Sequence, residues 1–78
     1  MSRELPHSVR INGRRTSVRL DDEIWLALQT ICAERGLTIH ELCTEVDAKR
    51  GQRSLVSALR VYAVLYFRDK AEREEARP

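Results

Sequence analysis

The 78-residue chain lacks the features that usually stabilise very small domains. Its two cysteines are too few for a disulfide framework, and their spacing does not suit a zinc site. A domain of this size buries only about 60% of the surface that its unfolded chain exposes, so its core alone would be marginal. We therefore expect oligomerisation to supply the missing stability.

Signatures of catalysis and of cofactor binding are missing as well. The sequence has no glycine-rich phosphate loop and no His-x-x-x-His or Cys-x-x-Cys pair. The acids Asp21, Asp22 and Glu23 are consecutive, which suits the start of a helix better than a converging site. We interpret the chain as a protein that is not an enzyme and that binds no cofactor and no metal.

The composition is that of one folded domain, with 42% hydrophobic and 33% charged residues. Residues 1–7 contain no apolar segment typical of a secretion signal, so the reducing cytoplasm is the expected compartment. The longest apolar run, 55–67, is shorter than the roughly 20 residues of a membrane span and is interrupted by Arg60. No membrane association is predicted.

Positive charge is concentrated near the N-terminus, although the formal net charge is only +2. Residues 1–20 contain five Arg and one Glu, whereas residues 21–78 contain nine basic and eleven acidic residues. Twelve of the fourteen basic residues are Arg, whose planar group of donors suits phosphates and guanine edges. This distribution favours an anionic partner.

One strand and three helices are predicted. Residues 15–20 alternate with a period of two, which places Thr16, Val18 and Leu20 on one face of a strand. The acids at 21–23 should cap the first helix, which ends at Gly36. Thr38 opens a second helix with a capping box, and Ser54 caps a third that is expected to be buried nearly all round.

A strand of this kind needs a partner, because an unpaired backbone edge cannot be buried without a large penalty. The favoured partner is the same strand of a second molecule, which would give an intermolecular antiparallel ribbon across a two-fold axis. An internal hairpin at Asn12-Gly13, with an extra strand at 8–11, is the alternative. It sets Arg10 opposite Arg15, which disfavours it, but it could coexist with the ribbon as an outer strand.

This order of elements resembles the ribbon-helix-helix DNA-binding superfamily. The resemblance is closest to a bacterial subfamily of short proteins with a third helix, and it covers about residues 8–68. It is carried by the strand at 15–20, by Trp25 and Leu28, and by the runs Glu34-Arg35-Gly36-Leu37-Thr38 and Ser57-Ala58-Leu59-Arg60. The implied fold class is mainly α with one N-terminal strand, an intertwined homodimer with an additional C-terminal helix.

The resemblance also implies how such a dimer would contact double-stranded DNA. Side chains on the outer face of the ribbon would read base edges in the major groove, and by position these are Arg15, Ser17 and Arg19. The start of the second helix would bind phosphate through Thr38, Ile39 and His40, with Arg14 as a further candidate. The expected dimer core consists of Val18, Leu20, Trp25, Leu28, Ile31, Leu42, Val46, Leu59, Tyr62 and Phe67, with Cys32 and Cys43 as small core residues.

The predicted organisation is a basic arm at 1–14, the ribbon-helix-helix domain with its third helix at 15–67, and a charged helix end or tail at 68–78. The leading hypothesis is a homodimer that binds DNA sequence-specifically and represses transcription. Higher-order assembly on DNA stays open. The alternative is an antitoxin-like or adaptor protein that mainly binds a protein partner.

Overall fold

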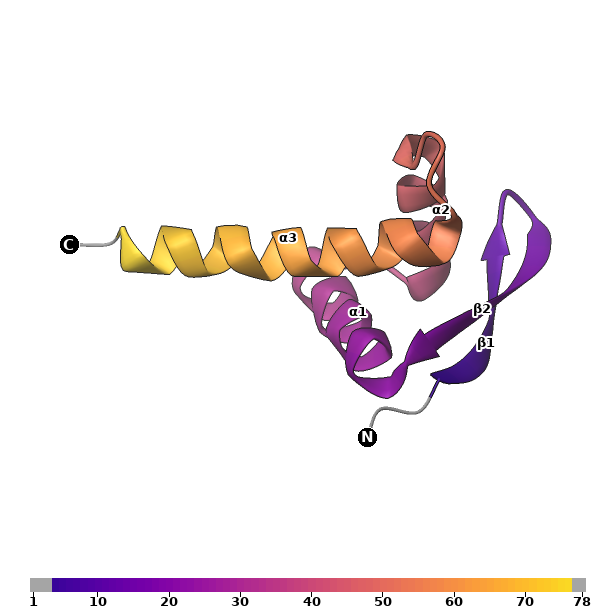
Figure 1. The fold of residues 1–78 in the computed structure, drawn as a ribbon, viewed down its shortest axis with the longest axis horizontal. Helices are drawn as coiled ribbons and strands as arrows, with labels where there is room; N and C mark the ends of the chain where they lie inside the picture. The colour runs from indigo at the N-terminus through magenta and orange to yellow at the C-terminus, as the bar shows by residue number, and fades with distance from the viewer. Residues whose placement is uncertain (1–3, 77–78) are drawn as a thin grey trace.

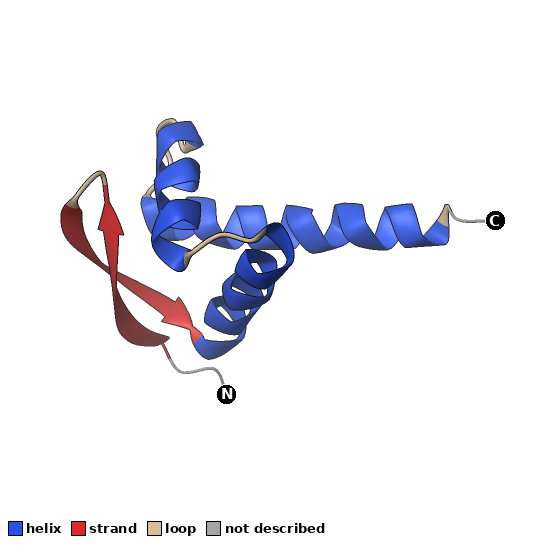
Figure 2. Cartoon of the chain, turned by 180° about the vertical axis from the view of Figure 1, so that it is seen from behind, coloured by secondary structure: helices blue, strands red, loops and turns tan. Residues whose placement is uncertain are grey.

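A computed structural model describes residues 4–76 as a β-hairpin followed by three helices (Figure 1). The hairpin lies at one end, and the last helix extends away from it (Figure 2). The predicted class, mainly helical with N-terminal β-structure and an additional C-terminal helix, is confirmed. The elements are β1 Glu4–Ile11, β2 Arg14–Asp21, α1 Asp22–Arg35, α2 Ile39–Lys49 and α3 Leu55–Glu75.

The segments predicted as an N-terminal arm and as a charged helix end or tail both contain regular secondary structure. The arm contains the whole of β1, which is longer than the extra strand considered at 8–11. The charged segment at 68–78 is helical as far as Glu75. Residues 1–3 of the arm and 77–78 of the tail lie outside the described residues.

Within the chain, β2 pairs antiparallel with β1, as the predicted alternative of an internal hairpin requires. The turn residues Asn12 and Gly13 have φ values of 51° and 78°, as a two-residue type I′ turn requires. The register sets Arg10 opposite Arg15, the like-charge pair that made the internal hairpin the less favoured prediction. The hairpin is nevertheless present over the full length of both strands.

Burial of one face explains why the hairpin forms in spite of this pair. Val9 and Ile11 of β1 and Val18 and Leu20 of β2 are at most 7% exposed. Burying four aliphatic side chains contributes about 1.5–3 kcal/mol each, whereas a like-charge cross-strand pair costs about 1 kcal/mol or less. Apolar burial therefore outweighs the repulsion between the two arginines.

Most of the predicted core is buried within a single chain. Trp25, Tyr62 and Phe67 are only half-buried, and they pack against the core from its rim. The Trp25 ring stacks on His7 with a centroid distance of 3.7 Å. The predicted residues that are buried are Val18, Leu20, Leu28, Ile31, Cys32, Leu42, Cys43, Val46 and Leu59.

The predicted helix ends are confirmed at three of four positions. Gly36 ends α1 with a φ of 69°. Thr38 and Glu41 form the capping box of α2, and Ser54 caps α3 by accepting a hydrogen bond from the backbone N–H of residue 57. The predicted side-chain cap of α1 was wrong: Asp21 makes no capping hydrogen bond, and its carboxylate instead lies 3.9 Å from Arg60 of α3.

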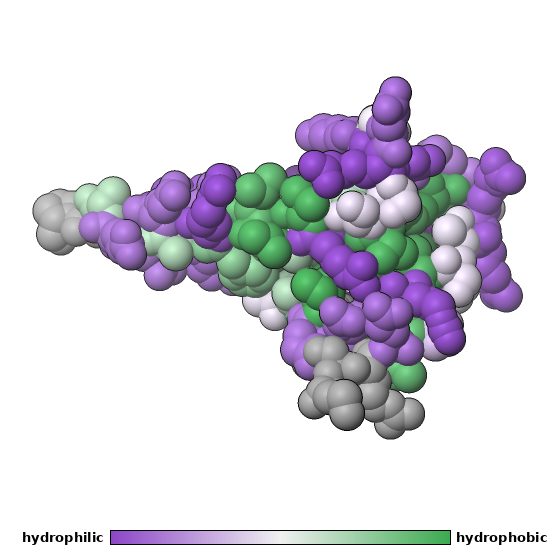
Figure 3. All heavy atoms as spheres, in the orientation of Figure 1, coloured by the Kyte–Doolittle hydropathy of each residue, from purple (hydrophilic) through white to green (hydrophobic). Residues whose placement is uncertain are grey.

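The third helix is less buried than expected. Ala58, Leu59 and Ala63 lie in the core, but Val64 and Leu65 are 61% and 40% exposed. Hydrophobic side chains gather on the middle of α3 in the space-filling view (Figure 3). The reason for the difference is geometric, since α3 extends past α1 and α2 and one chain covers only one of its sides. In the described range, no helix is long and apolar enough to cross a membrane.

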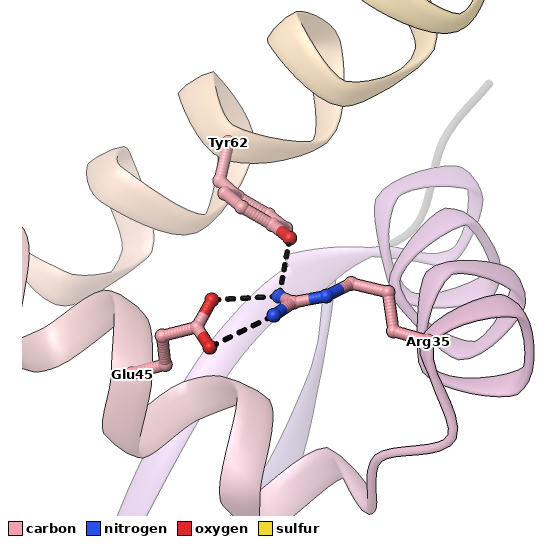
Figure 4. A network of polar contacts seen from close by, with 3 residues as sticks. All are labelled: Arg35, Glu45 and Tyr62. Atoms are coloured by element: carbon pink, nitrogen blue, oxygen red, sulfur yellow. Dashed lines mark hydrogen bonds and ion pairs between the residues drawn. The ribbon is translucent and has the colours of Figure 1, made fainter.

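A polar cluster ties the three helices together (Figure 4). The guanidinium of Arg35, at the end of α1, donates two hydrogen bonds to the Glu45 carboxylate, at 2.6 and 3.0 Å. It donates a third to the hydroxyl of Tyr62, at 2.8 Å. Because these residues come from α1, α2 and α3, the cluster fixes the helices beside one another at the rim of the core.

The burial of both thiols predicts that they are unreactive in the folded protein. Burial raises the pKa of Cys43 to about 11 and also raises the pKa of Cys32. Only the thiolate is the nucleophile, so a disulfide reagent at pH 8 should label neither residue in native buffer and both in denaturant. The absorbance of the released thiol measures this. Rapid labelling of Cys43 in native buffer would contradict the core.

The Arg35–Glu45 pair predicts a contribution to acid sensitivity. The hydrogen bond from Arg35 lowers the pKa of Glu45 from its ordinary value of 4.5. A carboxyl of this kind stabilises the fold above its unfolded pKa and loses that contribution as pH falls through its lower folded pKa. Glu45→Gln should therefore flatten the fall in unfolding free energy between about pH 5 and pH 3, measured by urea titration. An unchanged pH profile would show that the pair contributes nothing.

Candidate nucleic-acid interface

Four alternate cross-strand pairs lie on the face of the hairpin that points away from the core. The acidic pair Glu4 and Asp21, farthest from the turn, lies beside Arg60 of α3, and the other three pairs face solvent. Pro6 lies opposite Arg19, and Ser8 lies opposite Ser17. Arg10 and Arg15 form the third pair, nearest the turn. All six residues are exposed. The three predicted base-reading residues of β2 therefore do share one solvent-facing surface, and the structure adds a second row from β1 beside them.

The arginines of the hairpin have no counter-charges in the described range. Among residues 4–76, no acidic or polar group lies within ion-pair or hydrogen-bond distance of any of their guanidinium groups. The hairpin arginines are Arg10, Arg14, Arg15 and Arg19.

Arginines on the helices are used differently. Arg35 is paired with Glu45 at 2.6 Å, and Arg60 is paired with Glu4 at 3.0 Å. These ion pairs join elements of the fold, whereas the guanidinium groups of the hairpin arginines form no ion pair among residues 4–76. Uncompensated positive charge at this density, on a surface of extended backbone, suits a polyanion.

The outer edge of β1 is closed at two positions. Ile11 and Arg14 flank the two-residue turn as a hydrogen-bonded pair, so alternate residues beyond them direct their backbone groups away from the partner strand. Arg10 is one such residue, and its N–H donates to Nδ1 of His40 at 2.9 Å. Pro6 is another, and proline has no N–H. The β1 edge is therefore poorly suited to pair with a further strand.

The outer edge of β2 is open. Its outward-facing backbone groups belong to Arg15, Ser17 and Arg19, the same residues whose side chains are exposed. Across the range 4–76, the N–H groups of these three residues find no hydrogen-bond acceptor. An edge with a row of free donors and acceptors is a template for another strand.

The start of α2 lies beside the β1 edge, as the bond between His40 and Arg10 demonstrates. The N–H of Thr38 is not free for a ligand, because it donates to the Glu41 carboxylate at 2.8 Å. The N–H groups of Ile39 and His40 have no acceptor within the described residues. Because Nδ1 of His40 accepts a hydrogen bond, the neutral ring carries its hydrogen on Nε2 and can donate outward. Two of the three predicted phosphate-binding amides are thus available.

Arg14 lies on a different face of the hairpin from the predicted base contacts. Its side chain belongs to the opposite face of β2 from Arg15 and Arg19, at the tip of the hairpin. There it lines a cavity of about 480 Å³ together with Arg50 and Ser54. Its predicted role in phosphate binding stays a prediction.

Sequence reasoning missed Arg10 and Ser8 as members of the exposed face. The signal was present, since residues 8–11 alternate polar and apolar like 15–20. It was set aside because Arg10 would lie opposite Arg15. The bond from Arg10 to His40 could not have been predicted, because the two residues are 30 positions apart in the sequence.

Three comparisons with known proteins bear on this surface. A family model described as "Ribbon-helix-helix domain" matches residues 5–67, which include β1 except its first residue, all of β2, α1 and α2, and residues 55–67 of α3. The search of curated proteins and the search of solved structures gave no significant match.

Proposed function

The chain belongs to the ribbon-helix-helix family of DNA-binding domains, and from this premise we propose that it binds double-stranded DNA sequence-specifically as a homodimer and represses transcription. The observation that carries the proposal is the exposed row of Arg15, Ser17 and Arg19 on β2, with both arginines lacking counter-charges among residues 4–76. The same residues border the open edge of the sheet.

The homodimer follows from the difference between the two edges. The β1 edge is closed by Pro6 and by the bond from Arg10 to His40, so a second copy can add to the sheet only through β2. Antiparallel pairing of β2 with β2 of a second copy creates a two-fold axis and satisfies the free backbone groups of both chains. The resulting sheet has the order β1-β2-β2-β1, with the internal hairpin and the intermolecular ribbon present together.

In this dimer, the two inner strands form the ribbon that enters the major groove, which admits a two-stranded β-ribbon. Arg15 and Arg19 of each copy then contact base edges, where an arginine fork binds guanine O6 and N7. Ser17 lies between them and acts as a short donor and acceptor. The proposed site is accordingly two-fold symmetric and contains guanines.

Phosphate contacts are proposed for the start of α2. Ile39 and His40 contribute free backbone N–H groups at the positive end of the helix dipole, and the His40 ring adds a donor at Nε2. Thr38 contributes only its hydroxyl hydrogen, because its N–H is bound by Glu41. That carboxylate weakens the attraction of the helix end for phosphate, so we assign this helix end to positioning more than to affinity. Arg14 is assigned a peripheral contact.

The exposed apolar residues of α3 favour a second candidate function. Val64 and Leu65 form part of an uncovered surface that a protein partner could bury. Under this alternative, the protein is an antitoxin-like protein or an adaptor whose dimer mainly binds that partner. Co-purification of a stoichiometric partner, together with no DNA sequence preference, would place this function first.

The base-reading role predicts a selective loss of specific binding. Arg15→Ala or Arg19→Ala should weaken binding to an operator selected from a random duplex pool by about 1–3 kcal/mol, with the fold unchanged. Arg73→Ala is the matched control, because this arginine is also exposed but lies at the far end of α3. Fluorescence anisotropy at one stated salt concentration measures the operator affinities of the hairpin variants and of the control. Wild-type affinity in both hairpin variants would remove the base-reading role.

The open edge of β2 predicts that proline at position 17 disrupts the dimer, whereas proline at position 8, directly opposite, does not. Ser8 and Ser17 are directly opposite, and both direct their N–H away from the hairpin ladder. Ser17→Pro should yield monomers in sedimentation velocity, since it removes a donor from the β2 edge. Ser8→Pro, on the closed edge, should remain dimeric. Equal behaviour of the two variants would contradict pairing through β2.

A further inference from the structure

We propose that β1 is itself a DNA-binding element, in which Arg10 contacts the phosphate backbone beside the groove that β2 reads. This inference rests on the proposed function and extends it. It would make the contact surface twice as wide as a two-stranded ribbon and would give the two strands of the hairpin different tasks.

The charge arrangement of the free protein supports the contact. Arg10 and Arg15 form a cross-strand pair of the kind without mutual hydrogen bonds, in which the Cα atoms are only about 4.5 Å apart. Like charges at such positions destabilise a sheet, and no acid among residues 4–76 offsets this pair. A polyanion across the exposed face offsets this repulsion. The pair therefore destabilises the free protein but not the DNA-bound protein, which favours binding.

The surroundings of Arg10 fix its position at the side of the sheet. Its N–H is held by Nδ1 of His40, which ties this point of β1 to the start of α2. A groove of about 490 Å³ follows the same junction, lined by Arg10 and Gly13 from the hairpin and by Glu41, Thr44 and Glu45 from α2. Its two carboxylates disfavour phosphate inside the groove, so the proposed contact lies on the exposed face of the sheet. His40 thus acts as a positioning residue, because it orients the strand that bears the arginine.

The width of the sheet assigns Arg10 to phosphate and not to bases. Neighbouring strands lie about 4.8 Å apart, so the outer strands of the order β1-β2-β2-β1 are separated by about 14 Å. The major groove is only about 12 Å wide. Two inner strands fit within it, and the two outer strands meet its walls, which are the phosphate backbones. An arginine on β1 therefore lies over phosphate when Arg15 lies over bases.

The test compares Arg10→Gln with the wild-type chain on the selected operator and on a scrambled duplex, across a salt series. The dimer would lose two phosphate contacts, so the slope of log K against log salt should become less steep by about 1.8. At 0.1 M salt this corresponds to about 60-fold weaker binding, equally on both duplexes. Arg10→Lys keeps the charge and should restore most of the slope.

The outcomes separate the inference from the proposed function. If wild-type protein prefers an operator and Arg10→Gln matches its affinity and slope, the inference is overturned and the proposed function stands. If Arg10→Gln weakens binding to the operator but not to the scrambled duplex, Arg10 is a base-reading residue, and the inference is also overturned. If wild-type protein shows no sequence preference, the proposed function fails. The thermal midpoint of free Arg10→Gln should be at least that of wild type, and Arg73→Gln should leave all readouts unchanged.

Discussion

Backbone pairing of β2 is the constraint on which the rest of the arrangement depends. One edge of this strand is satisfied by β1, through a register that begins at the Asn12-Gly13 turn. The other edge presents the free backbone groups of Arg15, Ser17 and Arg19. The proposed dimer, its two-fold axis and the proposed ribbon in the groove would all follow from satisfying that second edge. The side chains proposed to contact DNA lie on the same strand that has the unsatisfied edge.

The arginines on the helices differ from those on the hairpin in their contacts. Those on the helices hold the fold: Arg35 joins three helices through Glu45 and Tyr62, and Arg60 ties α3 to the ends of the hairpin through Glu4 and Asp21. Those on the hairpin have no such partners among residues 4–76. The ion pairs of the fold and the proposed DNA contacts thus involve different guanidinium groups, so a hairpin arginine can be changed without removing a described ion pair.

Local rules were sufficient for much of the fold. The capping box at Thr38, the Gly36 stop and the alternation at 15–20 all depend on residues close in sequence, and the structure agrees with each. The strand partner was harder, because the repulsion between Arg10 and Arg15 is local whereas the burial that outweighs it is not. The Asp21 cap was lost to an ion pair with Arg60, 39 positions away in the sequence. The exposed side of α3 depends on how far that helix extends past its neighbours.

The candidate site was predictable to the same extent. The shared face of Arg15, Ser17 and Arg19 follows from a period of two, and the structure agrees. The occupied N–H of Thr38 belongs to the capping box that the spacing of Thr38 and Glu41 predicts, so that spacing already argued against this N–H as a phosphate contact. The bond between Arg10 and His40 depends on tertiary geometry that no spacing rule provides. Amide hydrogen exchange, followed residue by residue by NMR, tests the central claim most directly. At concentrations where the chain associates, the N–H of Ser17 should be protected and that of Ser8, directly across the hairpin, should exchange freely. Equally fast exchange at both residues would mean that β2 has no second partner strand.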